Sequence, residues 1–288
     1  MNKKKVLLIS LGVFLGIIAI FLLLSFTAFS LKNVEIDFRT SHQTITVSKD
    51  EIIESAGIKK GGSVFFKNKQ TYIKNLEEEY PYIKVVNIET VFPSKFVIHI
   101  AERQEIYAVK QDETYFICDN EFKVLKITDS YSSTQSNAIL VEGVILKRAN
   151  YALSDKLDIN NFVDIYESFY TNNRTLAEQQ STFKSVKFSL ERDDVTQKDI
   201  LNASIIFFNG QEYVIKNCTY GLSSKTHLLI EVYSQIFDFI GREIKSGSGE
   251  NIVLTEENLK KAQIIINNYY DYTSHNENEC YFDIIISD

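Results

Sequence analysis

The chain has 288 residues, of which 44% are hydrophobic, and its formal net charge is −7. Three of the 31 basic residues, Lys3, Lys4 and Lys5, stand at the start, so the remainder carries 28 basic against 38 acidic residues. That balance has the wrong sign for a surface that follows nucleic-acid phosphates or anionic lipid, and argues against nucleic acid as a partner. The length is compatible with two domains.

An uncharged, largely apolar run covers residues 6–31. As a helix rising about 1.5 Å per residue it would span roughly 39 Å, more than the ~30 Å hydrocarbon core of a bilayer. The lysines precede this run, whereas Lys32 is followed by Glu35 and Asp37. This basic bias predicts a cytoplasmic tail at residues 1–5, one transmembrane helix at 6–31 and an extracytoplasmic remainder.

A cleaved signal peptide is the alternative, because it shares the basic start and the apolar run. Its apolar region is usually about 7 to 15 residues long and ends in an A-x-A-like site. The run in this chain is longer, and its exit, Thr27-Ala28-Phe29-Ser30, is a poor cleavage site. We expect the anchor to be retained, and mass spectrometry of the mature N-terminus tests this.

The segment after the apolar run predicts a strand and then a helix. Residues 34–38 alternate apolar and polar, as in a half-buried strand. Ser48 and Glu51 form an S-x-x-E capping box, so a helix begins there. Gly57 stands at the position where a helix commonly ends with a left-handed residue.

A second helix is predicted at residues 69–79, before Pro81, with its acidic run 77–79 as a solvated face. Two alternating runs, 86–90 and 96–100, then flank a turn and predict a hairpin. Residues from about 33 to 102 thus predict a β-α-α-β-β unit, a small sheet covered on one face by two helices.

Beyond Arg103 the pattern changes to short strands with turns, which predicts a second domain. The predicted strands are residues 107–109, 114–118, 123–127, 185–190, 203–208, 212–216 and 281–286. The predicted helices are residues 161–170, 224–240 and 255–268, with a Gly/Ser/Asn loop at 245–251. Asn209-Gly210 predicts a two-residue hairpin turn. The expected fold class is α+β, with a transmembrane helix, the β-α-α-β-β unit and a mixed, mainly antiparallel β domain with flanking helices.

A series of motifs runs through the first unit and beyond it. Its members are Val47-Ser48, Glu51-Ile52, Gly57-Ile58, Gly61, Pro81-Tyr82-Ile83-Lys84, Val86, Ile88, Phe92-Pro93, Phe96, Ile98, Ile100 and Glu102-Arg103. The series resembles the extracytoplasmic POTRA module of the DivIB/FtsQ family of bacterial cell-division proteins. The resemblance covers the anchor and residues 33 to about 127, and is weaker later, where Phe208 to Ile215, Lys225 and Phe282-Asp283-Ile284 are similar to family motifs.

The resemblance implies a POTRA domain at residues 32–102 and an extracytoplasmic β domain with a C-terminal partner-binding region at 103–288. It implies a non-catalytic divisome scaffold at the septum, which links septal cell-wall synthesis to division. The implied partners are the single-pass proteins FtsL and DivIC (the FtsB counterpart) and, indirectly, septal peptidoglycan synthases.

In that family, partner binding includes strand addition at the closing edge of the β domain. The resemblance therefore implies a partner-binding site at Tyr281, Phe282, Asp283, Ile284 and Ile285. Two features depart from the family pattern. Ile285 stands where some relatives have an arginine, and residues 246–278 are longer and richer in Asn and Tyr than expected.

The chain shows no motif of catalysis or of metal binding. The four histidines, His42, His99, His227 and His275, stand at unrelated spacings, and His99 is expected to face outward on its strand. The three cysteines, Cys118, Cys218 and Cys280, lack C-x-x-C spacing and are expected to be buried free thiols. We therefore predict no catalytic residue, metal, cofactor or small-molecule substrate.

Two other hypotheses stay open beside the scaffold. One is an exported enzyme, such as a cell-wall hydrolase, which a converging Cys/His or paired-carboxylate pocket would favour. The other is a POTRA-bearing adaptor of a different envelope or secretion system, which neighbouring genes for an outer-membrane barrel would favour.

Overall fold

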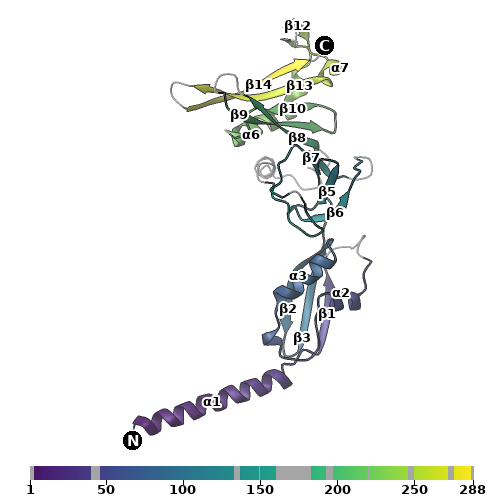
Figure 1. The fold of residues 1–288 in the computed structure, drawn as a ribbon. Helices are drawn as coiled ribbons and strands as arrows, with labels where there is room; N and C mark the ends of the chain where they lie inside the picture. The colour runs from purple at the N-terminus through teal and green to yellow at the C-terminus, as the bar shows by residue number, and fades with distance from the viewer. Residues whose placement is uncertain are drawn as a thin grey trace. The chain divides into compact units, whose positions relative to one another are not determined.

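The computed structural model describes residues 3–39, 46–132, 137–148, 150–159, 183–192, 197–219, 221–245, 250–271 and 276–286. The chain divides into two compact units, Met1–Gln104 and Glu105–Asp288. The first unit holds a long helix and a three-stranded sheet, and the second holds a large mixed sheet (Figure 1). The predicted α+β class is confirmed.

The first helix, α1, covers Lys3–Thr27, and its part from Ile9 to Thr27 is long and apolar enough to cross a membrane. The helix ends before the predicted boundary at Leu31. Leu31 instead belongs to the core of the first unit, where its backbone N–H donates to Gly62 O at 3.0 Å and its side chain is 1% exposed. The prediction was wrong here because hydropathy alone cannot separate residues that face lipid from residues that face a protein core.

The rest of the first unit has the predicted β-α-α-β-β order. Its elements are β1 (Asn33–Phe38), α2 (Lys49–Ser55), the 3-10 helix η1 (Val64–Phe66), α3 (Lys69–Glu79), β2 (Ile83–Val91) and β3 (Lys95–Glu102). The strand order is β1-β3-β2, with β1 parallel and β2 antiparallel to the central strand β3.

The helix signals act as the sequence predicts. The Ser48 side chain accepts from Glu51 N while the Glu51 carboxylate accepts from Ser48 N, so both halves of the capping box are present. Gly57 has φ of 72°, its N–H donates to Glu54 O, and Ile58 N–H donates to Ile53 O. These bonds complete a Schellman ending.

The core of this unit lies on one face of the sheet. Phe96, Ile98 and Ile100 of β3 are fully buried there and pack with Ile52 of α2 and Leu76 of α3. Both predicted helices therefore cover the same face.

His99 corrects one expectation, because it is only 8% exposed although it lies on the opposite face of β3. Its Nδ1 is 2.7 Å from Asp37 Oδ2 on β1, and its Nε2 is 3.4 Å from Glu89 Oε2 on β2. Strand alternation predicts correctly which face of the sheet His99 lies on, but it does not predict that side chains of the neighbouring strands bury the imidazole ring.

The acidic run of α3 is also not simply a solvated face. Glu77 accepts from Val85 N at 2.9 Å and is paired with Arg103, whose Nη2 lies 3.0 Å from Glu77 Oε2. The Arg103 side chain is 5% exposed and that of Glu77 14%. This buried ion pair ties the end of β3 to α3.

In the second unit the structure describes a nine-stranded sheet of order β14-β13-β10-β9-β8-β7-β4-β5-β6. Its strands are β4 (Tyr107–Gln111), β5 (Thr114–Cys118), β6 (Val124–Thr128), β7 (Ile139–Glu142), β8 (Phe183–Arg192), β9 (Asp199–Phe207), β10 (Glu212–Ile215), β13 (Ala262–Asp271) and β14 (Asn276–Ile286). A separate hairpin joins β11 (Glu243–Lys245) to β12 (Asn251–Val253). The described helices are α6 (Leu222–Gln235), the 3-10 helix η2 (Ile236–Phe239) and the short α7 (Glu256–Leu259).

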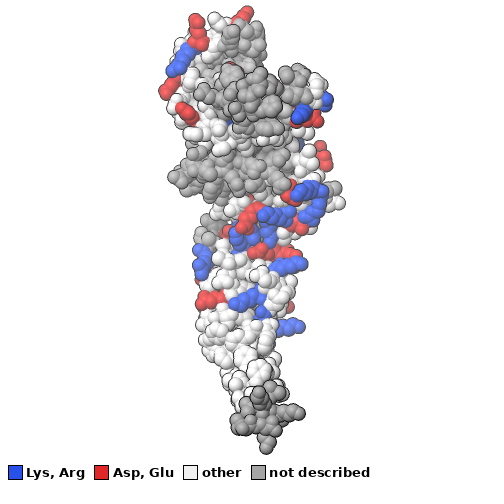
Figure 2. All heavy atoms as spheres, turned by 90° about the vertical axis from the view of Figure 1, so that its left-hand side faces the viewer, with Lys and Arg blue, Asp and Glu red and all other residues white. Residues whose placement is uncertain are grey.

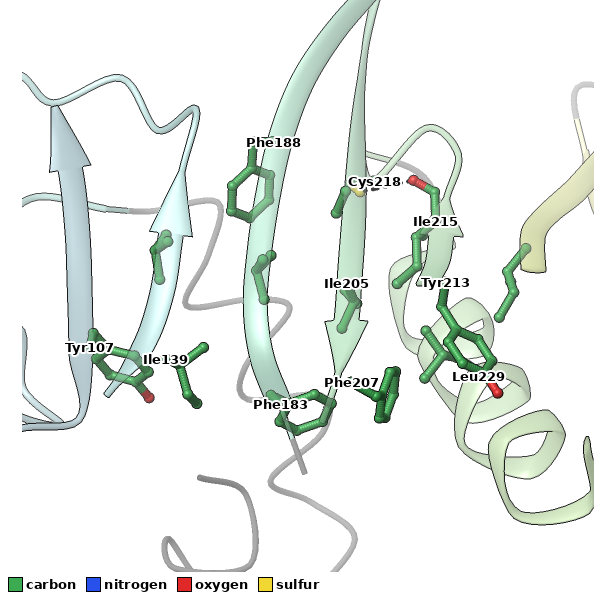
Figure 3. Packing of buried hydrophobic residues seen from close by; sticks show 14 of the residues in the cluster. Tyr107, Ile139, Phe183, Phe188, Ile205, Phe207, Tyr213, Ile215, Cys218 and Leu229 are labelled. Carbon is green, nitrogen blue, oxygen red and sulfur yellow. Dashed lines mark hydrogen bonds between the residues drawn. The ribbon is translucent and has the colours of Figure 1, made fainter. Parts of the chain in front are cut away.

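Buried side chains from most strands of this sheet meet in one core (Figure 3). Phe207 of β9 lies at its centre, with its ring 5.1 Å from that of Phe183 and 4.8 Å from that of Tyr213. Leu229 of α6 is fully buried in the same cluster, so α6 covers this face of the sheet.

Six predicted strands of the second unit correspond to β4, β5, β6, β8, β9 and β10, and the predicted 281–286 strand is the end of the longer β14. The hairpin at Asn209-Gly210 forms, but of these two residues only Gly210 has a positive φ.

The predicted helix at 224–240 corresponds to α6 and η2, and the ends of the predicted 245–251 loop belong to β11 and β12. The predicted helix at 161–170 lies outside the described residues.

The predicted helix at residues 255–268 is wrong. Only its start is helical, as α7, and from Ala262 the chain forms β13. Ala262, Ile264 and Ile266 are buried at every second position, which is a strand period. Three consecutive isoleucines favour a strand, and pairing with β10 and β14 fixes it.

Candidate partner interface

The candidate interface is β14, the strand that ends the nine-stranded sheet (Figure 1). On one side β14 pairs antiparallel with β13, with Ile284 opposite Ile264 and Asp283 opposite Ile265. β11 also contacts β14, but β11 is paired with β12. Among the described strands, none is paired with the outer side of β14.

The direction of the backbone groups of β14 follows from one hydrogen bond. Lys216 N donates to Ile266 O at 2.9 Å, so the polar groups of Ile266 point toward β10. Directions alternate along a strand, so those of Ile265 point toward β14 and meet Asp283. The N–H and C=O groups of the residues next to Asp283, Phe282 and Ile284, therefore point to the outer edge.

The five predicted partner-binding residues divide between the two faces of β14. Phe282 packs on the core, with its ring 5.4 Å from that of Phe239, and Ile284 is 8% exposed. Asp283 is exposed and Ile285 half-buried on the opposite face. Tyr281 lies in β14 opposite Asn267, and the structure describes its backbone but not its side chain.

A partner strand at this edge would meet two kinds of group. The backbone N–H and C=O groups of Phe282 and Ile284 point outward in the plane of the sheet, and the side chains of Asp283 and Ile285 lie on the face opposite the core. Phe282 and Ile284 serve the core with their side chains, so they can offer a partner only main-chain donors and acceptors. Asp283 makes no ion pair with another described residue, and it lies beside Ile265 of β13. The arrangement can therefore take up an extended segment and place a cation of that segment near Asp283.

The adjoining part of the sheet is fixed by a buried lysine that sequence reasoning noted only as part of a motif. Lys225, in the first turn of α6, is fully buried. Its Nζ donates to Lys216 O at 2.7 Å and to Asn217 O at 2.8 Å. This lysine binds α6 to the segment that follows β10, next to β13.

The groups that could carry chemistry do not come together in the described part of the chain. Cys118 and Cys218 are buried free thiols as predicted, and burial raises the pKa of Cys218 to about 11. His227 is exposed on α6, and the residues described include no group of three His, Cys, Asp or Glu side chains that could hold a metal.

Two family profiles match the chain. The profile of the FtsQ-type POTRA domain matches residues 29–103, which cover the three-stranded sheet and its helices. A profile described as the N-terminal domain of the prophage endopeptidase tail matches residues 158–235, a stretch that includes β8, β9, β10 and α6.

Curated relatives carry the name cell division protein DivIB. The protein of Clostridium acetobutylicum is 30% identical over 164 residues, which cover 57% of this chain and 59% of the relative. That of Clostridium tetani is 26% identical over 203 residues, which cover 64% and 72%. That of Clostridium botulinum is 26% identical over 190 residues, which cover 57% and 72%.

The chain is similar to the DivIB/FtsQ family. The FtsQ-type POTRA profile covers residues 29–103, which include all of the motif series of the first unit. The POTRA profile and the relatives named DivIB support a role in cell division, and the apolar helix at Ile9–Thr27 supports a single-pass membrane protein.

Proposed function

We propose that this protein is a non-catalytic scaffold of the bacterial divisome, anchored by α1 with its N-terminus in the cytoplasm. Its two extracytoplasmic parts are the POTRA domain of residues 32–102 and the β domain of residues 103–288. The scaffold gathers single-pass partners at the septum and, through them, connects septal peptidoglycan synthesis to division. The observation that carries the proposal is the similarity to relatives named cell division protein DivIB, supported by the match to the FtsQ-type POTRA profile.

The outer edge of β14 is the proposed binding site for FtsL-like and DivIC/FtsB-like partners. An unpaired edge offers a row of N–H and C=O groups, and a partner strand can extend the sheet by bonding to them. The outward groups belong to Phe282 and Ile284, whose side chains remain in the core. Binding would therefore need no rearrangement of the core.

Side chains on the open face would add specificity. Asp283 is exposed beside Ile265, and Ile285 is half-buried beside Gln263. A partner strand on this edge would place alternate side chains on the same face. A basic residue there would pair with the Asp283 carboxylate, and an apolar one would cover Ile285.

A proline at Ile284 tests the edge directly, because it removes an outward N–H without removing a bond to β13. The full-length Ile284→Pro variant should capture less of the FtsL-like and DivIC-like proteins from membranes than the wild type. Ile284→Val is the matched control, since it keeps both the apolar side chain and the N–H, and it should bind normally. Unchanged capture by a folded Ile284→Pro protein would move the interface away from this edge.

A further inference from the structure

Four phenylalanines gather at the end of the first unit where the chain leaves α1. We name Phe29, Phe65, Phe66 and Phe92 the phenylalanine collar. The ring centroids of Phe29 and Phe65 are 5.2 Å apart, and those of Phe65 and Phe92 are 5.6 Å apart. Phe65, Phe66 and Phe92 are nevertheless 44%, 61% and 59% exposed, so three large apolar side chains face out of a folded unit.

The collar comes from three segments that hydrogen bonds hold together. Val64 N, in η1, donates to Phe29 O at 2.9 Å. Lys32 N donates to Ser94 O at 2.8 Å, which fixes the β2–β3 turn that carries Phe92. The collar is therefore a fixed surface of the unit.

The chain itself places the collar beside the membrane. Phe29 follows the end of α1 at Thr27 by two residues. The ring of Phe65 is 5.9 Å from that of Phe21, and the ring of Phe66 is 6.2 Å from that of Phe26, both in α1. Rings that touch the last two turns of a spanning helix lie at the boundary between headgroups and acyl chains, where phenylalanine is favourable.

The segments that form the collar are basic, although the remainder of the chain is acidic overall. Residues 28–34, 57–68 and 92–95 contain no Asp or Glu and contain five lysines, Lys32, Lys59, Lys60, Lys67 and Lys95. Lys32, Lys59 and Lys60 are exposed, while Lys95 pairs with Glu35. In Figure 2 the described surface of α1 is white, and blue and red charged side chains begin above it.

Local charge decides this interaction, because salt screens charges beyond about 10 Å. Lys32 follows the end of α1 by five residues, and Lys59 and Lys60 precede Gly61, whose N–H donates to Leu31 O. Exposed lysines at this end of the unit can reach lipid phosphates, whereas charges farther than the screening length contribute little. An aromatic surface with a lysine rim matches a bilayer surface that contains anionic lipid.

We infer that the phenylalanine collar is a membrane-docking surface, inserted at the acyl boundary of an anionic phospholipid bilayer with Lys32, Lys59 and Lys60 at the headgroups. The inference rests on the proposed anchoring by α1. It adds a second attachment, so that the POTRA sheet stands in a fixed orientation on the membrane instead of swinging from one flexible point.

The absence of tryptophan from the chain allows a direct test, because one introduced tryptophan is a unique fluorescent reporter. The full-length Phe66→Trp protein is reconstituted into vesicles of phosphatidylethanolamine and phosphatidylglycerol whose acyl chains carry bromine, which quenches tryptophan on contact. Phe21→Trp in α1 is the positive reference. Val86→Trp is the matched negative control, since Val86 is 50% exposed on β2 and about 20 Å along the strand from Phe92.

Quenching of Phe66→Trp should approach that of Phe21→Trp and exceed that of Val86→Trp several-fold. Strong quenching of Phe21→Trp with none of Phe66→Trp would overturn the docking surface and leave the anchor intact. Absence of quenching at Phe21 would instead show that α1 itself is not in the bilayer.

A second comparison tests the anionic-lipid component. Lys59→Gln and Lys60→Gln, combined in the Phe66→Trp protein, should lower the quenching in phosphatidylglycerol vesicles toward the level in pure phosphatidylcholine vesicles. Equal quenching with and without the two lysines would overturn this part of the inference.

Discussion

At the residue scale, the Glu77–Arg103 pair is the polar contact whose loss should matter most in the POTRA unit. Arg103→Met leaves the Glu77 carboxylate buried without its guanidinium, and a broken buried pair costs about 3–5 kcal/mol. Glu77→Gln should cost a similar amount, because when its amide oxygen accepts from Val85 N its NH2 group faces the buried Arg103 guanidinium and leaves that charge without its carboxylate. Urea unfolding of both variants measures the two losses, and a small loss in either would contradict the burial of the pair.

Cys218 gives a prediction on pH. Burial raises the pKa of its thiol to about 11, against about 8.5 for a free cysteine. The folded state therefore holds the proton more tightly, so this stabilisation is complete below pH of about 8.5 and is lost as the pH rises toward 11. The unfolding midpoint of the wild type should fall more steeply over that range than that of Cys218→Val, and identical slopes would contradict the prediction.

Sequence reasoning at this scale succeeded where the signal is local. The capping box of Ser48 and Glu51 and the left-handed Gly57 depend on neighbours three to five residues away. Arg103, the partner of Glu77, is 26 residues away, and Asp37, which contacts His99, is 62 residues away, so a pattern of charges could not reveal these contacts.

At the element scale, the approach of β8 to the end of β7 depends on Gly143. Its φ is 74°, and a Cβ there would lie 2.0 Å from Phe188 O in β8. Backbone atoms cannot give way as a flexible side chain can, so Gly143→Ala should destabilise the β domain by roughly 2–4 kcal/mol.

Gly210 is the matched control for that prediction. It also has a positive φ, 88°, but nothing lies within 4 Å of a Cβ built there. Gly210→Ala should therefore cost only the conformational term, about 1–2 kcal/mol. Thermal unfolding of the two variants separates the cost of the steric clash with Phe188 from the cost of the positive φ alone. Equal losses of stability would show that the clash with Phe188 adds nothing.

Element prediction was most accurate where one period dominates, as in α3, whose limits Lys69 and Glu79 match the expectation. It was wrong for residues 262–268, because Leu259, Ala262 and Ile266 also fit a helical spacing. This segment is a strand because it pairs with β10 and β14, and neither of these strands directly adjoins it in the sequence.

At the scale of the whole molecule, the chain combines an apolar helix, a POTRA unit and a sheet whose last strand has an open edge. The family resemblance was accessible from motifs of the first unit, because these are short and carry turn and cap residues. The direction of the β14 backbone groups was not, since it depends on register with β13 and β10.

A role in division is the central part of the proposed function, and cell length after depletion tests it most directly. Depletion of the protein should produce filaments without septa. Re-expression of the wild type or of Ile284→Val should restore normal length, and Ile284→Pro should not. Cells that divide at normal length without the protein would contradict the proposed function.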